Sequence, residues 1–339
     1  MERRCGRSRL RRSTTGRPGS RTSCEAAVAQ SPLAEPTAAP VDRVGIVGLG
    51  VMGGAIARNL LRAGVAVIGH DIDQARTDAF AAAGGRRAAS AREVAERVEI
   101  VLLLLPSSAA LDAVTEGPDG LARGVRKGTT VIEMSTLRLH DKEALRGRLE
   151  PQGADVLDCP ISGTGVQAER GDIIVYASGS EGAIERCRRV LDLVSREVIN
   201  VGPFGTGSRI KYIANHLVAI HIAAAGEALA LARNAGIDPA FAIRVLSAGA
   251  GTSRMLEIRG PMMAARKYSP PSMTIRLFQK DLRIITEFAK SCGVPVPILA
   301  TASQLFAAAL DEEFGELDTA SVHEASLRAA TSPGPPAAT

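Results

Sequence analysis

A glycine-rich segment near residue 50 has the residue types and the spacing of a phosphate-binding turn. It follows an apolar run at 44–47, and an acid, Asp71, comes 18 residues after its last glycine. The first glycine permits a tight turn, the second lets the backbone approach a pyrophosphate, and the third allows close helix–strand packing. A helix that begins here presents unpaired N–H groups to the phosphates. The residues predicted to bind the dinucleotide in this turn are Gly48, Leu49, Gly50, Val51, Met52 and Gly53.

The acid decides which dinucleotide is expected. A carboxylate at Asp71 can accept hydrogen bonds from both hydroxyls of the adenosine ribose. Its charge would repel a 2′-phosphate, so the sequence predicts NAD, with NADP less favoured.

Other motifs combine polar side chains with glycine or with a second charge. Ser162-Gly163-Thr164 lies in a glycine-rich segment, Lys211 and Asn215 are four residues apart on one helix face, and Lys280 directly precedes Asp281. Each of these is ordinary by itself. A Ser-Gly-Thr run is usually a turn, a lysine on a helix is usually solvated, and a surface Lys–Asp pair contributes little stability.

The segments that carry these residues alternate between strand-like and helix-like patterns, which predicts a parallel sheet with helices on both faces. Predicted strands cover 44–47, 65–69, 99–105, 129–134, 155–158 and 173–177, and predicted helices cover 52–63, 73–83, 90–97 and 139–149. Ligands bind such sheets beyond the carboxyl ends of the strands. Leu105, Pro106 and Thr136 end or follow two of these strands, so they are predicted to lie on the cofactor side.

From residue 207 onward the pattern becomes helical. Segment 208–234 lacks proline and is rich in Ala, Ile and Leu, which predicts one long helix, and further helices are predicted at 239–248, 272–292 and 298–312. The predicted fold is therefore α/β: an N-terminal Rossmann doubly wound domain at 42–205, then an all-α C-terminal domain at 206–325. The long helix joins the two domains.

The ends of the chain differ from this body. The first 40 residues carry eight arginines against three glutamates, a surplus of five that equals the net charge of +5 of the whole chain. We predict a disordered Arg-rich extension at 1–41 and a disordered tail at 326–339. The extension is interpreted as an inert addition, an organellar transit peptide or a nucleic-acid-binding arm. The cysteines show no disulfide spacing, which favours a cytoplasmic location, or the mitochondrial matrix if the extension is a transit peptide.

Taken together and in order, the motifs resemble the β-hydroxyacid dehydrogenases, the family of 3-hydroxyisobutyrate dehydrogenase and tartronate semialdehyde reductase. The resemblance covers roughly residues 43 to 325. It implies proton transfer by Lys211, a place near the nicotinamide for Lys280, and a cofactor contact for Thr136. The residues that it implies in substrate binding are Ser162, Gly163, Thr164 and Asn215.

Three positions depart from the family pattern. Thr164 replaces the second glycine of the substrate loop, Ala214 stands where an asparagine is common, and Ala110 occupies a loop position that is often asparagine. Thr164 would add bulk and a hydroxyl beside the substrate, which leaves the substrate's identity open rather than the reaction class.

The implied chemistry is hydride transfer between a nicotinamide cofactor and a short-chain 3-hydroxy acid of the 3-hydroxyisobutyrate, glycerate (tartronate semialdehyde) or threonate type. Lys211 would take the hydroxyl proton as a neutral amine, or donate one in the reverse direction. A free lysine titrates near 10.4, so the site must lower its pKa toward ~7–8. Burial and a second cation such as Lys280 would both act in that direction.

Two other functions remain open. An imine reductase shares the fold, but that group usually replaces the lysine with Asp or Tyr. A catalytically silent relative could bind nucleic acid or chromatin through the basic extension, although the rest of the chain is neutral and keeps Lys211. We also expect a homodimer or homotetramer, no membrane span, and no metal site, since His216 and His221 fall on different helix faces.

Overall fold

The computed structural model describes residues 42–331. The predicted disorder at 1–41 and 332–339, and the interpretations of the basic extension, lie outside the described residues. The described residues all belong to one compact unit. The boundary predicted between residues 205 and 206 falls inside that unit, between the last strand and the longest helix.

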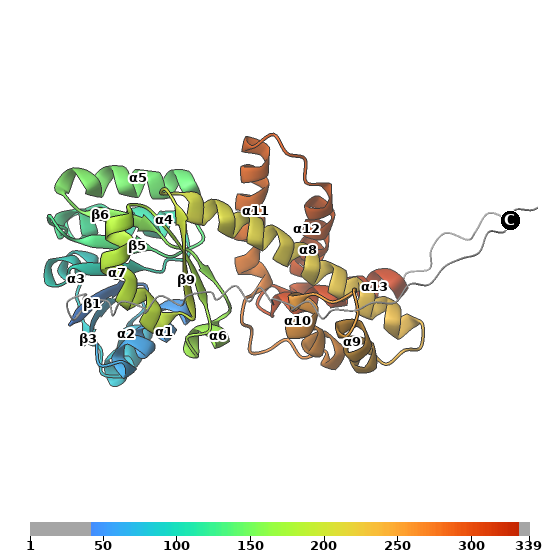
Figure 1. Ribbon diagram of the computed structural model, residues 1–339. Helices are drawn as coiled ribbons and strands as arrows, with labels where there is room; N and C mark the ends of the chain where they lie inside the picture. Colours follow the sequence, from blue (N-terminus) through green and yellow to red (C-terminus); the bar gives the residue numbers. More distant parts are fainter. Residues whose placement is uncertain (1–41, 332–339) are drawn as a thin grey trace, which may run out of the picture. The chain divides into compact units, whose positions relative to one another are not determined.

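One mixed β-sheet forms the first part of the described chain (Figure 1). Its strands are β1 (Arg43–Val47), β2 (Ala66–His70), β3 (Arg86–Arg87), β4 (Ile100–Leu103), β5 (Thr130–Glu133), β6 (Asp155–Asp158), β7 (Ile161–Ser162), β8 (Ile174–Ser178) and β9 (Glu197–Gly202). The order is β3-β2-β1-β4-β5-β6-β8-β7, with β9 paired to β8. The first six strands in this order are parallel, whereas β8 runs antiparallel to β6 and β7. This is the strand order of a dinucleotide-binding sheet.

Helices cover both faces of the sheet. They are α1 (Val51–Arg62), α2 (Gln74–Ala82), α3 (Ala91–Arg97), α4 (Ser108–Thr115), α5 (Leu139–Leu149), α6 (Gly165–Glu169) and α7 (Glu181–Val194), with short 3₁₀ turns η1 (Leu121–Arg123) and η2 (Glu150–Gln152). Residues of α1, α2, α6 and α7 pack in one apolar core, and residues of α3, α4 and α5 pack in another. Strands such as β4, whose four residues are all buried, separate the two cores.

A second, helical region follows Gly205. It contains α8 (Thr206–Asn234), α9 (Pro239–Ser247), α10 (Arg254–Ala265), α11 (Ile275–Ser291), α12 (Pro297–Ala309), a π-helical turn η3 (Leu310–Phe314), a 3₁₀ turn η4 (Thr319–Ser321) and α13 (Val322–Thr331). The 29-residue α8 contacts α10, α11, α12 and α13, and these helices share a core of their own (Figure 1). Because α8 also contacts β6, β8 and β9, it connects this core to the sheet.

The predicted fold class, a Rossmann-type sheet followed by a helical region, is confirmed. Several elements were nevertheless missed. No prediction covered α4, α7, α10 or β9. The helix α10 has Pro261 inside it, a residue that normally argues against a helix interior. By contrast, α7 has a Ser180 cap and an amphipathic face, so its sequence signal was present.

The predicted boundary of the C-terminal tail is wrong. The helix α13 continues through Thr331, six residues beyond the predicted end of the helical region at residue 325. Its buried face includes Val322, His323 and Ala325, and it packs against α8. Tertiary contact with α8 stabilises this helix, so regular structure continues beyond the predicted end.

Among the described helices, α8 is the one that is long and apolar enough to cross a membrane by length and composition. No such segment was predicted from the sequence. Of its most apolar window, 44% is buried inside the protein, as in the core helix of a folded domain. The absence of a membrane span stays a prediction.

Candidate active site

The glycine-rich turn between β1 and α1 has no room for side chains at two of its glycines. Gly48 adopts φ +95°, and a Cβ there would lie 2.2 Å from the carbonyl oxygen of Leu104. A Cβ at Gly53 would lie 1.9 Å from the carbonyl oxygen of Gly48. Gly50 differs, because the nearest atom to its Cβ position is Nη1 of Arg76 at 3.7 Å. The outer glycines therefore pack the turn closely, while Gly50 leaves its backbone open to a ligand.

The N-terminus of α1 can receive an anion. Its N-cap, Gly50, offers no side-chain hydrogen bond, and there is no acid in the first turn of the helix. Val51 is 70% exposed at the same end. Open N–H groups and the positive end of a helix dipole, beside a glycine backbone, are what a pyrophosphate needs. The residues present therefore fit a dinucleotide.

Asp71 follows β2 and is brought to this turn. Its Oδ2 accepts a hydrogen bond from the Leu49 backbone N–H at 2.7 Å, and its Oδ1 accepts one from the Asp73 N–H at 2.9 Å. The Asp71 side chain is 6% exposed. The carboxylate thus braces the glycine turn, a role that the sequence analysis did not predict, and it lies where the ribose is expected.

The loops after β4 and β5 lie side by side on the same edge of the sheet. The Leu105 backbone N–H donates to Oγ of Ser135 at 2.7 Å, and Pro106 next to it is exposed. Thr136 is half-buried, and its carbonyl oxygen accepts a hydrogen bond from Nζ of Lys280 at 2.5 Å. A lysine of α11 therefore contacts a predicted cofactor loop.

The Ser-Gly-Thr loop lies between β7 and α6. Gly163 adopts φ +146°, which favours glycine. Thr164 is the N-cap of α6 and forms a capping box with Gln167. The Thr164 N–H and hydroxyl both bond to Oε1 of Gln167, at 3.0 and 3.2 Å. The Thr164 hydroxyl therefore serves to begin α6, and its predicted place beside the substrate stays a prediction.

The same loop contacts the cofactor turn. A Cβ at Gly165 would lie 2.4 Å from Cγ1 of Val51, so this glycine lets α6 approach the start of α1. The side chain of Asn59 in α1 also donates to the Ala168 carbonyl of α6 at 2.7 Å. The predicted substrate loop and the predicted phosphate turn are therefore neighbours.

Lys211 and Asn215 lie on the buried face of α8 and are 8% and 5% exposed. Nδ2 of Asn215 donates to Oδ2 of Asp281 at 2.9 Å, and Nζ of Lys280 lies 3.4 Å from the other oxygen of Asp281. Within residues 42–331, Nζ of Lys211 has no hydrogen-bond partner. These four side chains form a polar group in which the Lys211 amine is available to a ligand.

Electrostatics in this group favours a lysine that can exchange a proton. Burial lowers the pKa of Lys211 to about 8; the nearby Asp281 carboxylate opposes this shift, and the Lys280 ammonium adds to it. Burial also raises the pKa of Asp281, against the two lysines and Asn215, which lower it. The direction and size of the Lys211 shift agree with the prediction from the sequence.

A fully buried ionic cluster, which the sequence analysis missed, holds these parts in place. Nζ of Lys142 lies 2.6 Å from Oε2 of Glu133 and 2.8 Å from Oδ1 of Asp158, and it donates to the Ser135 carbonyl at 2.7 Å. Asp158 also accepts hydrogen bonds from the N–H and Oγ of Ser208, at 2.7 and 2.8 Å. The cluster therefore links a cofactor loop to the first turn of α8, one turn before Lys211. A lysine inside an ordinary helical pattern gives no sequence signal of this role.

The structure brings the predicted residues together in two sets that share contacts. The first set contains the glycine turn at 48–53, Asp71, the Ser162–Thr164 loop and the loops that follow β4 and β5. The second set contains Lys211, Asn215 and Lys280. Lys280 joins them through Thr136. Among the described residues, no hydrogen bond or ion pair joins the Ser162–Thr164 loop to Lys211.

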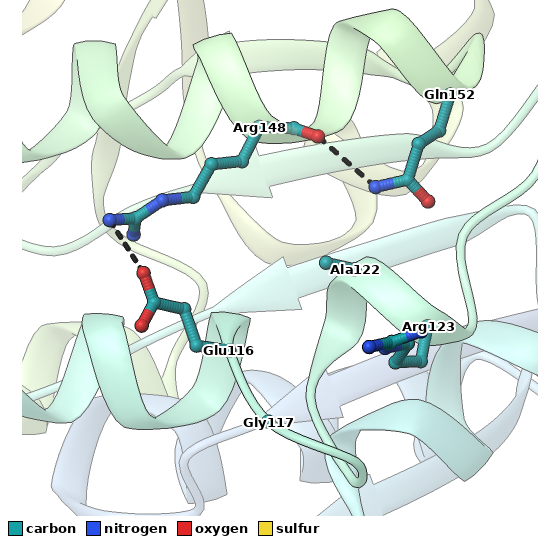
Figure 2. Close-up of a pocket in the computed structure, with 6 residues that line it drawn as sticks. All are labelled: Glu116, Gly117, Ala122, Arg123, Arg148 and Gln152. Atoms are coloured by element: carbon teal, nitrogen blue, oxygen red, sulfur yellow. Dashed lines mark hydrogen bonds and ion pairs between the residues drawn. The ribbon is translucent and has the colours of Figure 1, made fainter.

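A hollow of about 470 Å³ lies elsewhere (Figure 2). Its lining is Glu116, Gly117, Ala122, Arg123, Arg148 and Gln152. These residues belong to connections that lead into the amino ends of β5 and β6, opposite the edge that carries Pro106 and Thr136. Figure 2 shows Arg148 paired with Glu116, at 2.6 Å, and Gln152 donating to the Arg148 carbonyl, at 3.1 Å. It is not part of the candidate site.

Within residues 42–331, no group of three or more His, Cys, Asp or Glu side chains could hold a metal ion. The expectation of a metal-free site stays a prediction.

Comparison with protein-family descriptions finds two matches, which together cover most of the chain. The NAD binding domain of 6-phosphogluconate dehydrogenase matches residues 43–202. The NAD-binding domain of NADP-dependent 3-hydroxyisobutyrate dehydrogenase matches residues 205–325. One description names NAD alone and the other an NADP-dependent enzyme, so the matches do not distinguish the two cofactors.

Individual proteins are similar over nearly the same range. An L-threonate dehydrogenase from Haemophilus influenzae is 34% identical over 281 residues, which are 82% of this chain and 93% of that protein. A 2-hydroxy-3-oxopropionate reductase from Escherichia coli is 32% identical over 268 residues, 78% of this chain and 90% of that protein. The crystal structure of a 3-hydroxyisobutyrate dehydrogenase from Salmonella typhimurium superposes with a TM-score of 0.76 and 36% identity, over 83% of this chain and 99% of that one.

Proposed function

This chain belongs to the β-hydroxyacid dehydrogenase family, and from that premise we propose that it oxidises a short hydroxy acid with NAD, using Lys211 as general acid and base. Membership makes it a hydroxy-acid dehydrogenase that uses NAD or NADP. The preference for NAD and the role of the lysine are the proposal.

The observation that carries the proposal is the state of Lys211. A buried amine whose pKa is lowered to about 8 is present in both protonation forms near neutral pH. A general base or acid is most effective when its pKa lies near the working pH. The Lys280 ammonium beside this amine opposes a rise of its pKa, and the Asp281 carboxylate opposes a further fall.

The residues of the site divide the remaining tasks. The nicotinamide, when bound, supplies the acceptor for the hydride of the substrate's carbinol carbon. Lys211 accepts the hydroxyl proton during oxidation and returns one during reduction. Asn215, held by Asp281 at 2.9 Å, orients the substrate from the same helix face. The substrate carboxylate is held by Ser162 and the Gly163 N–H, because the Thr164 N–H and hydroxyl are engaged with Gln167.

The preference for NAD rests on Asp71. Its carboxylate lies at the glycine turn, where an acid binds the ribose hydroxyls and repels a 2′-phosphate. We therefore expect a lower KM for NAD than for NADP.

Similarity narrows the substrates to be tried first. The relatives are named for L-threonate, 2-hydroxy-3-oxopropionate and 3-hydroxyisobutyrate, all short acids that carry few atoms beyond the carboxylate. The assay measures initial rates of the purified full chain with threonate, glycerate, 3-hydroxyisobutyrate and 3-hydroxypropionate, each with NAD and with NADP.

The decisive variant is Lys211→Ala. Loss of general acid–base catalysis typically costs roughly 10²- to 10⁴-fold in rate, and we expect a loss of kcat in this range with NAD binding retained. Lys290→Ala removes an exposed lysine of α11 and serves as the matched control. Turnover that survives in Lys211→Ala would overturn the assignment of the lysine. Saturable NAD binding without turnover on any acid would favour a silent scaffold.

We also propose a homodimer or homotetramer. Along α8, apolar residues at spacings of three and four stay exposed, among them Ile213 at 52% and Leu217 at 49%. Light scattering of the full chain measures the mass directly. A monomer at micromolar concentration would contradict this part of the proposal.

A further inference from the structure

The adenosine end of the predicted dinucleotide site contains a cation as well as an acid. Arg76 lies in the first turn of α2, and its Nη1 is 3.5 Å from Oδ2 of Asp71. The same Nη1 is the nearest atom to the Cβ position of Gly50, at 3.7 Å. The guanidinium therefore lies between the glycine turn and the ribose-binding acid, with about half of its side chain (52%) exposed.

Such an arrangement contains the recognition chemistry of both dinucleotides. An acid at this place binds the 2′-hydroxyl of NAD, whereas a nearby arginine accommodates the 2′-phosphate of NADP. Asp71 favours NAD, but an Arg76 guanidinium without other partners would attract a 2′-phosphate and oppose that preference.

A second carboxylate pairs with Arg76 and so keeps its charge from acting on a ligand. Oδ2 of Asp73 lies 3.3 Å from Nε of Arg76, so the guanidinium is held between Asp73 and Asp71. Asp73 is itself fixed, because its Oδ1 caps α2 by accepting from the N–H groups of Ala75 and Arg76, at 2.9 and 3.4 Å. One cation thus faces two anions where a 2′-phosphate would bind.

We propose that Asp73 is a cofactor-specificity residue, which keeps Arg76 paired with carboxylates and so makes it unavailable to a 2′-phosphate. This inference rests on the proposed preference for NAD and names a residue pair that strengthens it. Asp73 and Arg76 are half exposed, so water screens the interaction and the effect is a modest one.

The test uses Asp73→Ser in the full chain. Serine caps helices about as well as aspartate, so α2 keeps its N-cap while the charge is removed. Asp78→Ser is the matched control, because Asp78 lies on the same helix but pairs with Arg87, at 2.7 Å. Dissociation constants for NAD and for NADP are measured by calorimetry, and thermal melting checks that each variant folds.

We expect Asp73→Ser to tighten NADP binding roughly three- to tenfold, with NAD binding changed less than about twofold. Asp78→Ser should leave the ratio of the two constants unchanged. The double variant Asp73→Ser/Arg76→Ala should lose the gain, because the gain comes from the freed arginine.

Two outcomes would overturn the inference: an unchanged ratio in folded Asp73→Ser, or a gain that persists without Arg76. A wild-type chain that binds NADP as tightly as NAD would also overturn it, since Arg76 would then already be available. Because the readout is binding, it is separate from the proposed reaction. If the chain oxidises no hydroxy acid, the proposed reaction is wrong. The ratio of the dissociation constants for NAD and NADP still tests the role of Asp73.

Discussion

Lys211 depends on its neighbours for its chemistry. Burial lowers the pKa of this amine to about 8, Asp281 raises it and Lys280 lowers it. Oxidation needs the neutral amine, which accepts a proton, and reduction needs the ammonium, which donates one. The two directions of one reaction therefore have opposite pH dependence.

The first prediction follows from this sign. For oxidation, kcat/KM should rise with pH and level off above an apparent pKa near 8, and for reduction it should fall over the same range. Initial rates between about pH 6 and pH 10, at fixed ionic strength, measure both profiles. Parallel profiles for the two directions would contradict a single acid–base group.

The second prediction tests separately how each of the two charges beside Lys211 changes its pKa. Asp281→Asn removes the group that raises the pKa of Lys211, so the limb of the pH profile should move to lower pH. Lys280→Met removes the group that lowers it, so the limb should move to higher pH. Lys280→Met should also raise KM for the cofactor, because Nζ of Lys280 contacts the Thr136 loop. Shifts of the same sign in both variants would contradict this account.

At the scale of the element, glycine decides how closely a helix approaches a strand. Gly53 lies in the first turn of α1, and a Cβ there would meet backbone rather than a flexible side chain. By contrast, Gly147 lies inside α5 with nothing within 4 Å of its Cβ position. The same substitution should therefore act in opposite directions at the two sites.

The third prediction compares these two glycines. Gly53→Ala should lower the melting temperature and weaken NAD binding more than roughly tenfold, because the turn must move to admit the methyl group. Gly147→Ala should raise the free energy of unfolding by about 0.5–1 kcal/mol, because alanine loses less entropy in a helix. Thermal melting and NAD titration of both variants test it, and unaffected NAD binding in Gly53→Ala would be the contrary result.

The backbone N–H groups at the start of α8 find their hydrogen-bond acceptors on other elements. The Gly207 N–H donates to Oγ of Ser178 at 3.0 Å, and the Ser208 N–H donates to Asp158 at 2.7 Å. Side chains of the sheet therefore complete the N-terminus of the helix, as a local cap would. This sets the rotation of α8 and directs Lys211 and Asn215 toward α11.

At the scale of the whole molecule, the buried cluster around Lys142 connects the sheet to the helical region, because Asp158 bonds both Lys142 and Ser208. The Lys142 ammonium has three acceptors, and the side chains of Lys142, Glu133 and Asp158 are fully buried. Burial lowers the pKa of Lys142, but its two carboxylate partners outweigh burial and raise it overall, so the group stays charged. Removing it leaves two carboxylates in the interior without a cation.

The fourth prediction is the cost of that loss. Lys142→Met should reduce the free energy of unfolding by about 3–5 kcal/mol, as for other buried pairs that lose one partner. Lys290→Met, at an exposed position of α11, should change it by less than about 0.5 kcal/mol. Denaturant unfolding of both variants measures the difference, and equal stabilities would show that the buried cluster is not needed.

Much of the molecule follows from the sequence by itself. The glycine spacing, the acid after β2 and the alternation of apolar segments predicted the sheet, its cofactor edge and the helical region. These features are local: they depend on backbone conformation, hydrophobic period and helix ends within a few residues. The family resemblance then added Lys211, Asn215 and Lys280, and the structure places these side chains within one polar group.

Only the tertiary structure decided what the polar groups do. The Thr164–Gln167 capping box and the Asp73–Arg76 pair are local, but the sequence does not show that Asp71 braces the glycine turn or that Lys142 is buried between two carboxylates. Burial and the distance between charges depend on segments far apart in the chain, and these two quantities set hydrogen-bond partners and pKa values.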